Sequence, residues 1–198
     1  SHICLWGEGR GRRSSVMILG QSPGYEENRA GRPFIGPSGR LLSEALAEAG
    51  LEDYYITNTV KCFPGRLKVD KKHIKACAAY LDEEIEKYHP THILALGNEA
   101  VQRLLGKGRI MEIAGKEQWS EKYNCWVVGA FHPAFILRQM GRIGAWKADL
   151  YRFARLVKGD LLDKPPVNVK LVGVDISLSD FRAEFVKNCK AQRPVAFD

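Results

Sequence analysis

Three side chains in this sequence have the chemistry to hold a flat, polar ring. Phe34 lies within Gly31–Gly36, whose terminal glycines let the backbone approach a ligand closely. Asn58 ends an apolar segment and offers an acceptor and a donor pair, which suit the edge of a nucleobase. His132 lies on a turn bounded by proline, where an imidazole can face a pocket. Each residue also has a structural explanation, as a core aromatic, a turn residue or a packed imidazole, so both interpretations remain open.

The candidate residues follow short apolar runs that predict buried strands. These runs are Val16–Leu19, Tyr54–Val60, His92–Leu96 and Cys125–Ala130. Amphipathic stretches between and after them predict helices that begin near Ser38, Asp70 and Asn98, and a closing helix around residues 146–157. Because strands alternate with helices and hairpin signals are few, we expect a three-layer α/β/α sandwich with a central, mainly parallel sheet. Ligands bind beyond the carboxyl ends of the strands in such sheets, which is where the candidate residues fall.

Several short segments occur in an order and approximate spacing that together are specific, although each is weak alone. They are Gly20-Gln-Ser-Pro-Gly24, Glu26-Glu27, Gly31-Arg-Pro-Phe-Ile-Gly36, Ile56-Thr-Asn-Thr-Val-Lys-Cys62, Leu94-Ala-Leu-Gly97 and His132-Pro-Ala-Phe-Ile-Leu-Arg138. This combination resembles the uracil-DNA glycosylase superfamily, and its iron-sulphur branch most closely. The resemblance covers roughly residues 5–158. It implies an α/β/α sandwich fold and an enzyme that hydrolyses the N-glycosidic bond to uracil in DNA.

The resemblance also implies roles for individual residues. Phe34 matches the aromatic that stacks on the flipped base, and Asn58 matches the amide that reads the uracil edge. Glu27 matches the residue beside the C5 position of the base, where it would exclude thymine, and Gly20 is expected beside the substrate. His132 matches the histidine that stabilises negative charge on uracil O2 as the bond breaks, which is often the largest catalytic contribution.

Two positions depart from the family pattern. The iron-sulphur branch usually has glutamate where this sequence has Gln21, and another branch has a water-activating aspartate where it has Ser22. Neither side chain is a general base near neutral pH, so we expect them to orient water rather than deprotonate it. Because an oxocarbenium-like centre needs little base assistance, reduced activity is expected rather than none. The alternative is a catalytically impaired module that binds DNA or senses uracil.

The cysteines leave a cofactor open. Cys62 and Cys77 match two of the four ligands of the branch's [4Fe-4S] cluster. The other two ligands would form a Cys-x2-Cys pair upstream of Trp6, where this sequence has nothing. Cys4 aligns with neither of them, although it could serve as a third ligand. Cys77 also shares an apolar helix face with Leu81, and free cysteine is a common core residue.

The charge balance favours a polyanionic partner. The chain has 198 residues and a formal net charge of +7. Basic residues flank the expected site loops: Lys61, Lys71 and Lys72 follow the second predicted strand, and Arg138 and Arg142 follow the histidine turn. We expect them to contact DNA phosphates, which position the backbone for base extrusion. The alternative is that these segments form ordinary solvated faces.

The chain ends in a segment of different character. We expect a glycosylase-like domain over residues 1–160, and a linker with the start of a following domain over residues 161–198. Pro194-Val-Ala-Phe-Asp198 resembles the first strand of the 3'-5' exonuclease domain in DNA polymerases of the polymerase I type. Because glycosylase-like domains precede phage polymerases in this superfamily, we expect polymerase and exonuclease domains in the same parent chain. Five cysteines, an odd number, and the lack of a long apolar run favour a cytoplasmic protein without a membrane segment.

Overall fold

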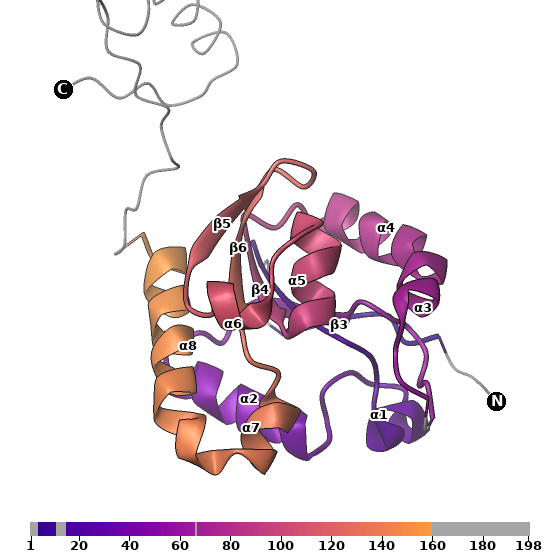
Figure 1. The fold of residues 1–198 in the computed structure, drawn as a ribbon, viewed down its shortest axis with the longest axis horizontal. Coiled ribbons are helices and arrows are strands. Elements are labelled where there is room, and N and C mark those ends of the chain that lie inside the picture. The colour runs from indigo at the N-terminus through magenta and orange to yellow at the C-terminus, as the bar shows by residue number, and fades with distance from the viewer. Residues whose placement is uncertain (1–3, 11–14, 66, 160–198) are drawn as a thin grey trace, which may run out of the picture. The chain divides into compact units, whose positions relative to one another are not determined.

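The computed structural model describes residues 4–10, 15–65 and 67–159, and its centre is one six-stranded sheet (Figure 1). The strands are β1 (Glu8–Arg10), β2 (Val16–Gly20), β3 (Tyr54–Asn58), β4 (His92–Leu96), β5 (Glu117–Ser120) and β6 (Cys125–Ala130). Their order across the sheet is β1-β3-β2-β4-β6-β5. The four inner strands run parallel, and β1 and β5 pair antiparallel at the two edges. The expected mainly parallel sheet is therefore confirmed.

Helices cover both faces of this sheet (Figure 1). They are α1 (Tyr25–Ala30), α2 (Pro37–Glu48), α3 (Lys71–Ala76), α4 (Ala78–Tyr88), α5 (Asn98–Leu105), α6 (Ile110–Ile113), α7 (Pro133–Arg138) and α8 (Ile143–Val157), with a short 3-10 turn, Met140–Arg142. Side chains alternate along each strand, so one strand supplies both cores. In β2, Val16 and Ile18 join the core under α2 and α8, whereas Met17 and Leu19 join the core under α4 and α5. These two cores give the predicted three layers.

The structure differs from the sequence prediction at the sheet edges and in one helix. Neither edge strand was predicted, because β1 has three residues and β5 (Glu117-Gln-Trp-Ser120) lacks an apolar run. The single helix expected after Asp70 is divided at Cys77, which ends α3 and precedes α4. The predicted second strand ends at Asn58 rather than Val60. This shorter strand places Asn58 at the carboxyl edge of the sheet.

The caps of two helices also differ from the prediction. Gly36 rather than Ser38 is the N-cap of α2, and Gly97 rather than Asn98 is the N-cap of α5. The Asn98 side chain instead accepts a hydrogen bond from the backbone N–H of Ile110, at 2.8 Å. Both observed caps are glycines, and a Cβ atom would lie 3.0 Å from the Glu27 carboxylate at Gly36 and 3.5 Å from His132 Cβ at Gly97.

Two further expectations concern the C-terminal segment and the absence of a membrane-spanning helix. The predicted linker and following domain, residues 161–198, lie outside the described residues, and so does Asp198. Within the described ranges, no helix has both the length and the apolar character needed to cross a bilayer.

Candidate active site at the carboxyl edge of the sheet

The ends of β2 and β3 bring Gly20 and Asn58 together. These residues are register partners in the parallel pair. The Asn58 side chain is 3% exposed, and its Oδ1 atom has no hydrogen-bond partner in the described part of the chain. An unsatisfied buried polar atom costs about 1–3 kcal/mol. The site therefore holds an acceptor that is ready for an N–H donor from a ligand.

Phe34 is held against these two residues in a strained conformation. Its φ of 54° lies in the left-handed region, which costs a non-glycine residue about 1–3 kcal/mol. A Cβ atom at Gly20 would lie 2.4 Å from the Phe34 ring and 2.6 Å from Asn58 Oδ1. A Cβ atom at Gly39 would lie 2.0 Å from the Phe34 carbonyl oxygen. Glycine at both positions therefore permits the aromatic ring to lie beside the amide.

Glu27 stabilises the loop that carries Phe34 through hydrogen bonds to backbone N–H groups. Its carboxylate accepts hydrogen bonds from the backbone N–H groups of Gly24, at 3.1 Å, and Gly36, at 2.8 Å. The side chain is 7% exposed. Both carboxylate oxygens are thus used to join the ends of two loops. The predicted contact of Glu27 with C5 of the base stays a prediction, and the structure adds this positioning role.

His132 completes the strand-end cluster, which we define as Gly20, Phe34, Asn58 and His132. It follows β6 as the N-cap of α7, half-buried, and its Nδ1 atom accepts a hydrogen bond from Ala134 N–H at 3.2 Å. In the neutral ring this bond places the proton on Nε2. The ring centroids of His132 and Phe34 are 6.3 Å apart.

Electrostatics keep the His132 ring neutral. Burial lowers the pKa of His132 to about 4, helped by the nearby Arg138 guanidinium and opposed by the Glu27 carboxylate. The ring is therefore an uncharged hydrogen-bond donor at neutral pH. The Phe34 ring, the Asn58 amide and the His132 imidazole thus come together from two loops and the end of β3, an arrangement that suits a flipped pyrimidine.

Comparison with known proteins agrees with this geometry. The family model for the uracil DNA glycosylase superfamily matches residues 6–154. The chain belongs to the uracil-DNA glycosylase superfamily. It is 35% identical over 162 residues to the type-4 uracil-DNA glycosylase of Pyrobaculum aerophilum, covering 74% of this chain and 80% of the relative. It is 30% identical over 159 residues to the type-4 enzyme of Archaeoglobus fulgidus, covering 73% and 77%.

A third relative is a much longer protein. The DNA polymerase of Bacillus phage SP01 is 29% identical over 162 residues, which are 80% of this chain but 17% of the polymerase. The polymerase thus contains a segment similar to this glycosylase-superfamily domain.

The two residues that depart from the superfamily pattern lie at the edge of the strand-end cluster. Gln21 and Ser22 follow β2 directly and are half-buried. The Gln21 carbonyl oxygen accepts a hydrogen bond from Val60 N–H at 2.8 Å, which joins this loop to the segment after β3. Neither side chain supplies a carboxylate, and the predicted role of both residues in orienting water stays a prediction.

Three cysteine thiols, those of Cys4, Cys62 and Cys77, lie near one another at the loop that follows β3. Lys61 N–H donates a hydrogen bond to Cys77 Sγ at 3.4 Å. Burial raises the pKa of Cys62, and the thiols of Cys77 and Cys4 raise it further. Burial and the Cys77 thiol also raise the pKa of Cys4. The structure thus brings Cys4 toward the pair that the family pattern indicates.

The three cysteines Cys4, Cys62 and Cys77 do not by themselves form a metal site in the described part of the chain. Among the described residues, no set of three or more His, Cys, Asp or Glu side chains is arranged to hold a metal ion. The side chains of Cys62 and Cys77 interact with each other, so these two residues fit as two ligands of an iron-sulphur cluster. Cys77 is also buried against Val60 and Val69, as its core interpretation predicts.

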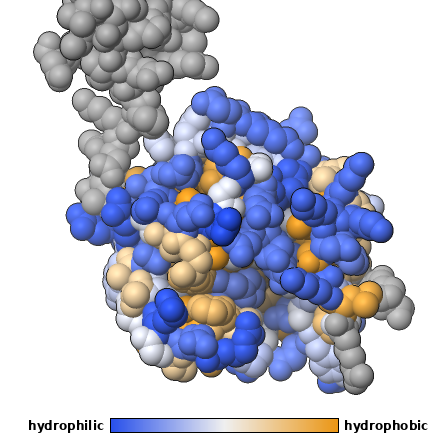
Figure 2. All heavy atoms as spheres, in the orientation of Figure 1, coloured by the Kyte–Doolittle hydropathy of each residue, from blue (hydrophilic) through white to orange (hydrophobic). Residues whose placement is uncertain are grey.

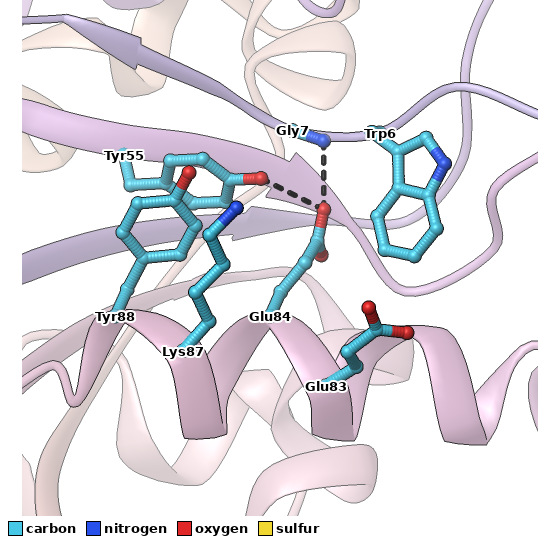
Figure 3. A pocket seen from close by; sticks show the side chains of 7 residues that line it. All are labelled: Trp6, Gly7, Tyr55, Glu83, Glu84, Lys87 and Tyr88. Atoms are coloured by element: carbon cyan, nitrogen blue, oxygen red, sulfur yellow. Dashed lines mark hydrogen bonds between the residues drawn. The ribbon is translucent and has the colours of Figure 1, made fainter.

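Lys61 is not a phosphate contact, and that prediction is wrong. Its side chain is 1% exposed, and its ammonium group donates hydrogen bonds to Thr57 and to the buried Glu84 carboxylate. Glu84 also accepts hydrogen bonds from Tyr55 Oη at 3.0 Å and Gly7 N–H at 2.7 Å (Figure 3). A buried ammonium needs a charged partner, and α4 supplies it. Sequence spacing showed the lysine but not the carboxylate 23 residues later.

The other predicted cationic contacts are exposed. Lys71 and Lys72 lie at the start of α3, and Arg138 and Arg142 lie near the end of α7 and in the turn after it. The Arg138 guanidinium helps to lower the pKa of His132, so Arg138 lies near the strand-end cluster. The sequence analysis did not identify Gly39 as a residue that positions Phe34. The only sign of it in the sequence is that a glycine occurs three residues after Gly36.

Proposed function

We propose that this domain is a uracil-DNA glycosylase, which binds a flipped uracil and hydrolyses its N-glycosidic bond. The observation that carries the proposal is the buried Asn58 Oδ1 atom, which lacks a partner in the described part of the chain. Uracil N3–H is the donor that such an acceptor requires, and the amide nitrogen of the same side chain can donate to uracil O4. Superfamily membership and the similarity to type-4 enzymes support the same substrate.

The chemistry follows from the positions of the side chains. Phe34 stacks on the base, Asn58 reads its edge, and the Nε2–H of His132 donates to uracil O2. The bond between C1' of the sugar and N1 breaks, and its electron pair leaves with uracil. Water, oriented by Gln21 and Ser22, adds to C1', and its proton is released as the abasic sugar forms. Stabilising the departing anion is the main contribution of the protein.

An excision assay tests this function directly. Uracil-containing oligonucleotides, single-stranded and duplex, are incubated with the protein and then cleaved at abasic sites with alkali. We expect cleavage at the uracil and none in matched thymine oligonucleotides. Tight uracil-dependent binding without cleavage would identify the alternative, a uracil-sensing module. Neither binding nor cleavage would contradict both.

The pH dependence of excision should lack a histidine step. Because the pKa of His132 is about 4, the ring stays neutral from pH 5.5 to 8, and the single-turnover rate should be flat across that range. An inflection near the ordinary value of about 6.5 would contradict a neutral donor. Nitrogen-15 NMR of the ring should show the proton on Nε2.

The same shift affects stability in a defined direction. Between about pH 6.5, the ordinary value, and about pH 4, the unfolded chain binds a proton on His132 that the folded chain does not. This contribution therefore lowers the free energy of unfolding as pH falls through that window. Replacing His132 with glutamine should reduce that part of the pH dependence in denaturant titrations.

Restoring the missing carboxylate should accelerate excision. Gln21→Glu gives the water-binding loop a general base, and positioned acid-base catalysis contributes roughly a hundredfold or more. We expect a higher single-turnover rate with unchanged uracil affinity. Ser22→Ala is the matched control, because it changes the neighbouring side chain without adding charge. An unchanged rate would mean that water orientation does not limit the wild-type domain.

We also propose that Cys62 and Cys77 are two ligands of a [4Fe-4S] cluster. Such a cluster would cross-link the loop after β3 to the junction between α3 and α4, and would supply electron-transfer capacity. Anaerobically purified protein that carries its native upstream residues should contain iron and sulphide. Cys62→Ser and Cys77→Ser should each remove iron and lower the melting temperature, whereas Cys125→Ser tests a buried cysteine outside the group. Iron-free protein whose stability is the same in all three variants would contradict the cluster.

The parent chain is proposed to be a phage-type DNA polymerase. The match to the Bacillus phage SP01 polymerase supports this context, in which residues 1–160 form the glycosylase domain and residues 161–198 lead into an exonuclease domain. Polymerase and exonuclease domains would then be partners in cis, acting in the host cytoplasm. The excised or sensed uracil would be in the template of the same enzyme.

A further inference from the structure

A basic groove lies on the side of the sheet covered by α3, α4 and α5. We call it the α3–α5 groove; its volume is about 550 Å³. Its lining residues come from α3, the first half of α4, the end of α5 and the turn between β5 and β6. The charged residues that line it are Lys71, Lys75, Asp82, Arg103, Lys107 and Lys122. Hydrophilic side chains predominate on this side of the molecule (Figure 2).

Asp82, the one carboxylate among the described residues that line the groove, already has hydrogen-bond and ion-pair partners. Asp82 accepts hydrogen bonds from Arg103 at 2.6 Å and from Tyr123 Oη at 2.7 Å, and it pairs with Lys122 at 3.4 Å. The Arg103 side chain is only 9% exposed and also donates to the Ala78 carbonyl oxygen. This network neutralises Asp82 and fixes the wall of the groove. The remaining basic side chains of the groove lining have no carboxylate in that lining to balance their positive charge.

Three lysines supply that charge at the open surface. Lys71, Lys75 and Lys107 are exposed, and no carboxylate of the described residues forms an ion pair with any of them. Lys71 and Lys75 lie on α3, whereas Lys107 lies just after the end of α5. Such a two-sided arrangement of ammonium groups suits a chain of phosphates better than a single small anion.

The groove is separate from the strand-end cluster. Helix α5 begins at Asn98, beside Gly97 and the His132 loop, and its far end lines the groove. Helix α5 is about 12 Å long, and the two of its residues that line the groove, Gln102 and Arg103, lie in its second half. The Lys71 end lies at the start of α3, on the chain that leaves β3 and Asn58. A strand whose uracil occupies the cluster can therefore continue toward the groove.

We propose that the α3–α5 groove binds the phosphodiester backbone of the DNA beyond the uracil nucleotide. Among the described residues, no aromatic side chain lines the groove, and the apolar residues in its lining are Ile74 and Ala78. Base stacking, which needs aromatic surfaces, is therefore not part of the recognition. Binding there should be independent of sequence and strongly dependent on salt. The inference rests on the proposed function only in taking DNA as the ligand.

Charge reversal on opposite walls tests the groove. The double variant Lys75→Glu and Lys107→Glu is compared with Arg155→Glu and Lys158→Glu, which makes the same change in charge on α8, across the sheet. Affinity is measured for single strands of about 30 and about 5 nucleotides, and for a duplex, each with one central uracil, at several salt concentrations. The two lengths separate contacts beyond the uracil nucleotide from contacts around it, and the strand and duplex arms show which form of DNA supplies the backbone.

We expect the groove variant to weaken binding of the long strand by about tenfold at low salt and to reduce its salt slope by about 1.4, which is 0.7 for each lost phosphate contact. The short strand and the α8 variant should change little. An equal loss in both double variants, or an equal loss for long and short strands, would overturn the proposal. Uracil excision from the short strand should survive in the groove variant. Failure of the glycosylase proposal would instead abolish excision in the wild type, so the two failures are distinguishable.

Discussion

Replacing His132 with alanine should lower the single-turnover rate of uracil excision by about a hundredfold to a thousandfold, the usual cost of losing one donor to a developing negative charge. The neutral ring is held by Ala134 N–H with its Nε2 proton available, so the variant loses a positioned donor rather than a charge. The loss should appear in the rate more than in the affinity for uracil DNA, because the charge on O2 develops as the bond breaks.

A second substitution separates hydrogen bonding from packing at this position. His132→Gln retains an N–H donor on a side chain of similar reach, and we expect it to recover part of the rate. The His132→Ala effect should persist in the Gln21→Glu background, because the two residues act on the leaving group and on water respectively. A His132→Ala variant as fast as wild type, with an unchanged melting temperature, would remove this residue from the mechanism.

Replacing Asn58 with leucine should abolish recognition of uracil without destabilising the fold. Leucine has a similar shape, and it removes a buried amide oxygen that has no partner in the described part of the chain. Removing such a group is neutral or stabilising, so the melting temperature should be unchanged or higher. Excision should fall by about ten thousandfold, because a site that is built to hydrogen-bond its substrate discriminates strongly when the bonds are lost.

The Asn58→Asp variant tests which edge of the base is read. Aspartate accepts from N3–H but cannot donate to O4, so uracil loses one hydrogen bond and gains a repulsion. Binding of uracil DNA should weaken while binding of uracil-free DNA stays the same. Adding Phe34→Ala to either Asn58 variant should deepen the uracil-specific loss. Equal losses on uracil and uracil-free DNA would show that Asn58 supports the fold and does not read the base.

The sequence by itself determined the inner sheet and the family, and it named all four members of the strand-end cluster. Continuous apolar runs bounded by glycine and proline are a local signal, and they located β2, β4 and β6 to within a residue. Parallel strands end at one edge of a sheet, so the residues after them had to converge. The motifs could therefore name Phe34, Asn58 and His132 before any distance was known.

Only the tertiary structure decided which groups are engaged and which are available. Lys61 and Glu84 are 23 residues apart, and only the packing of α4 against the β1–β3 edge of the sheet makes them a buried pair rather than two surface charges. The Glu27 carboxylate is similarly committed to Gly24 and Gly36, while Asn58 Oδ1 stays without a partner among the described residues. Local patterns encode what a residue can donate or accept. Whether that capacity is already satisfied depends on chain segments that folding brings together, and this decides where a ligand binds.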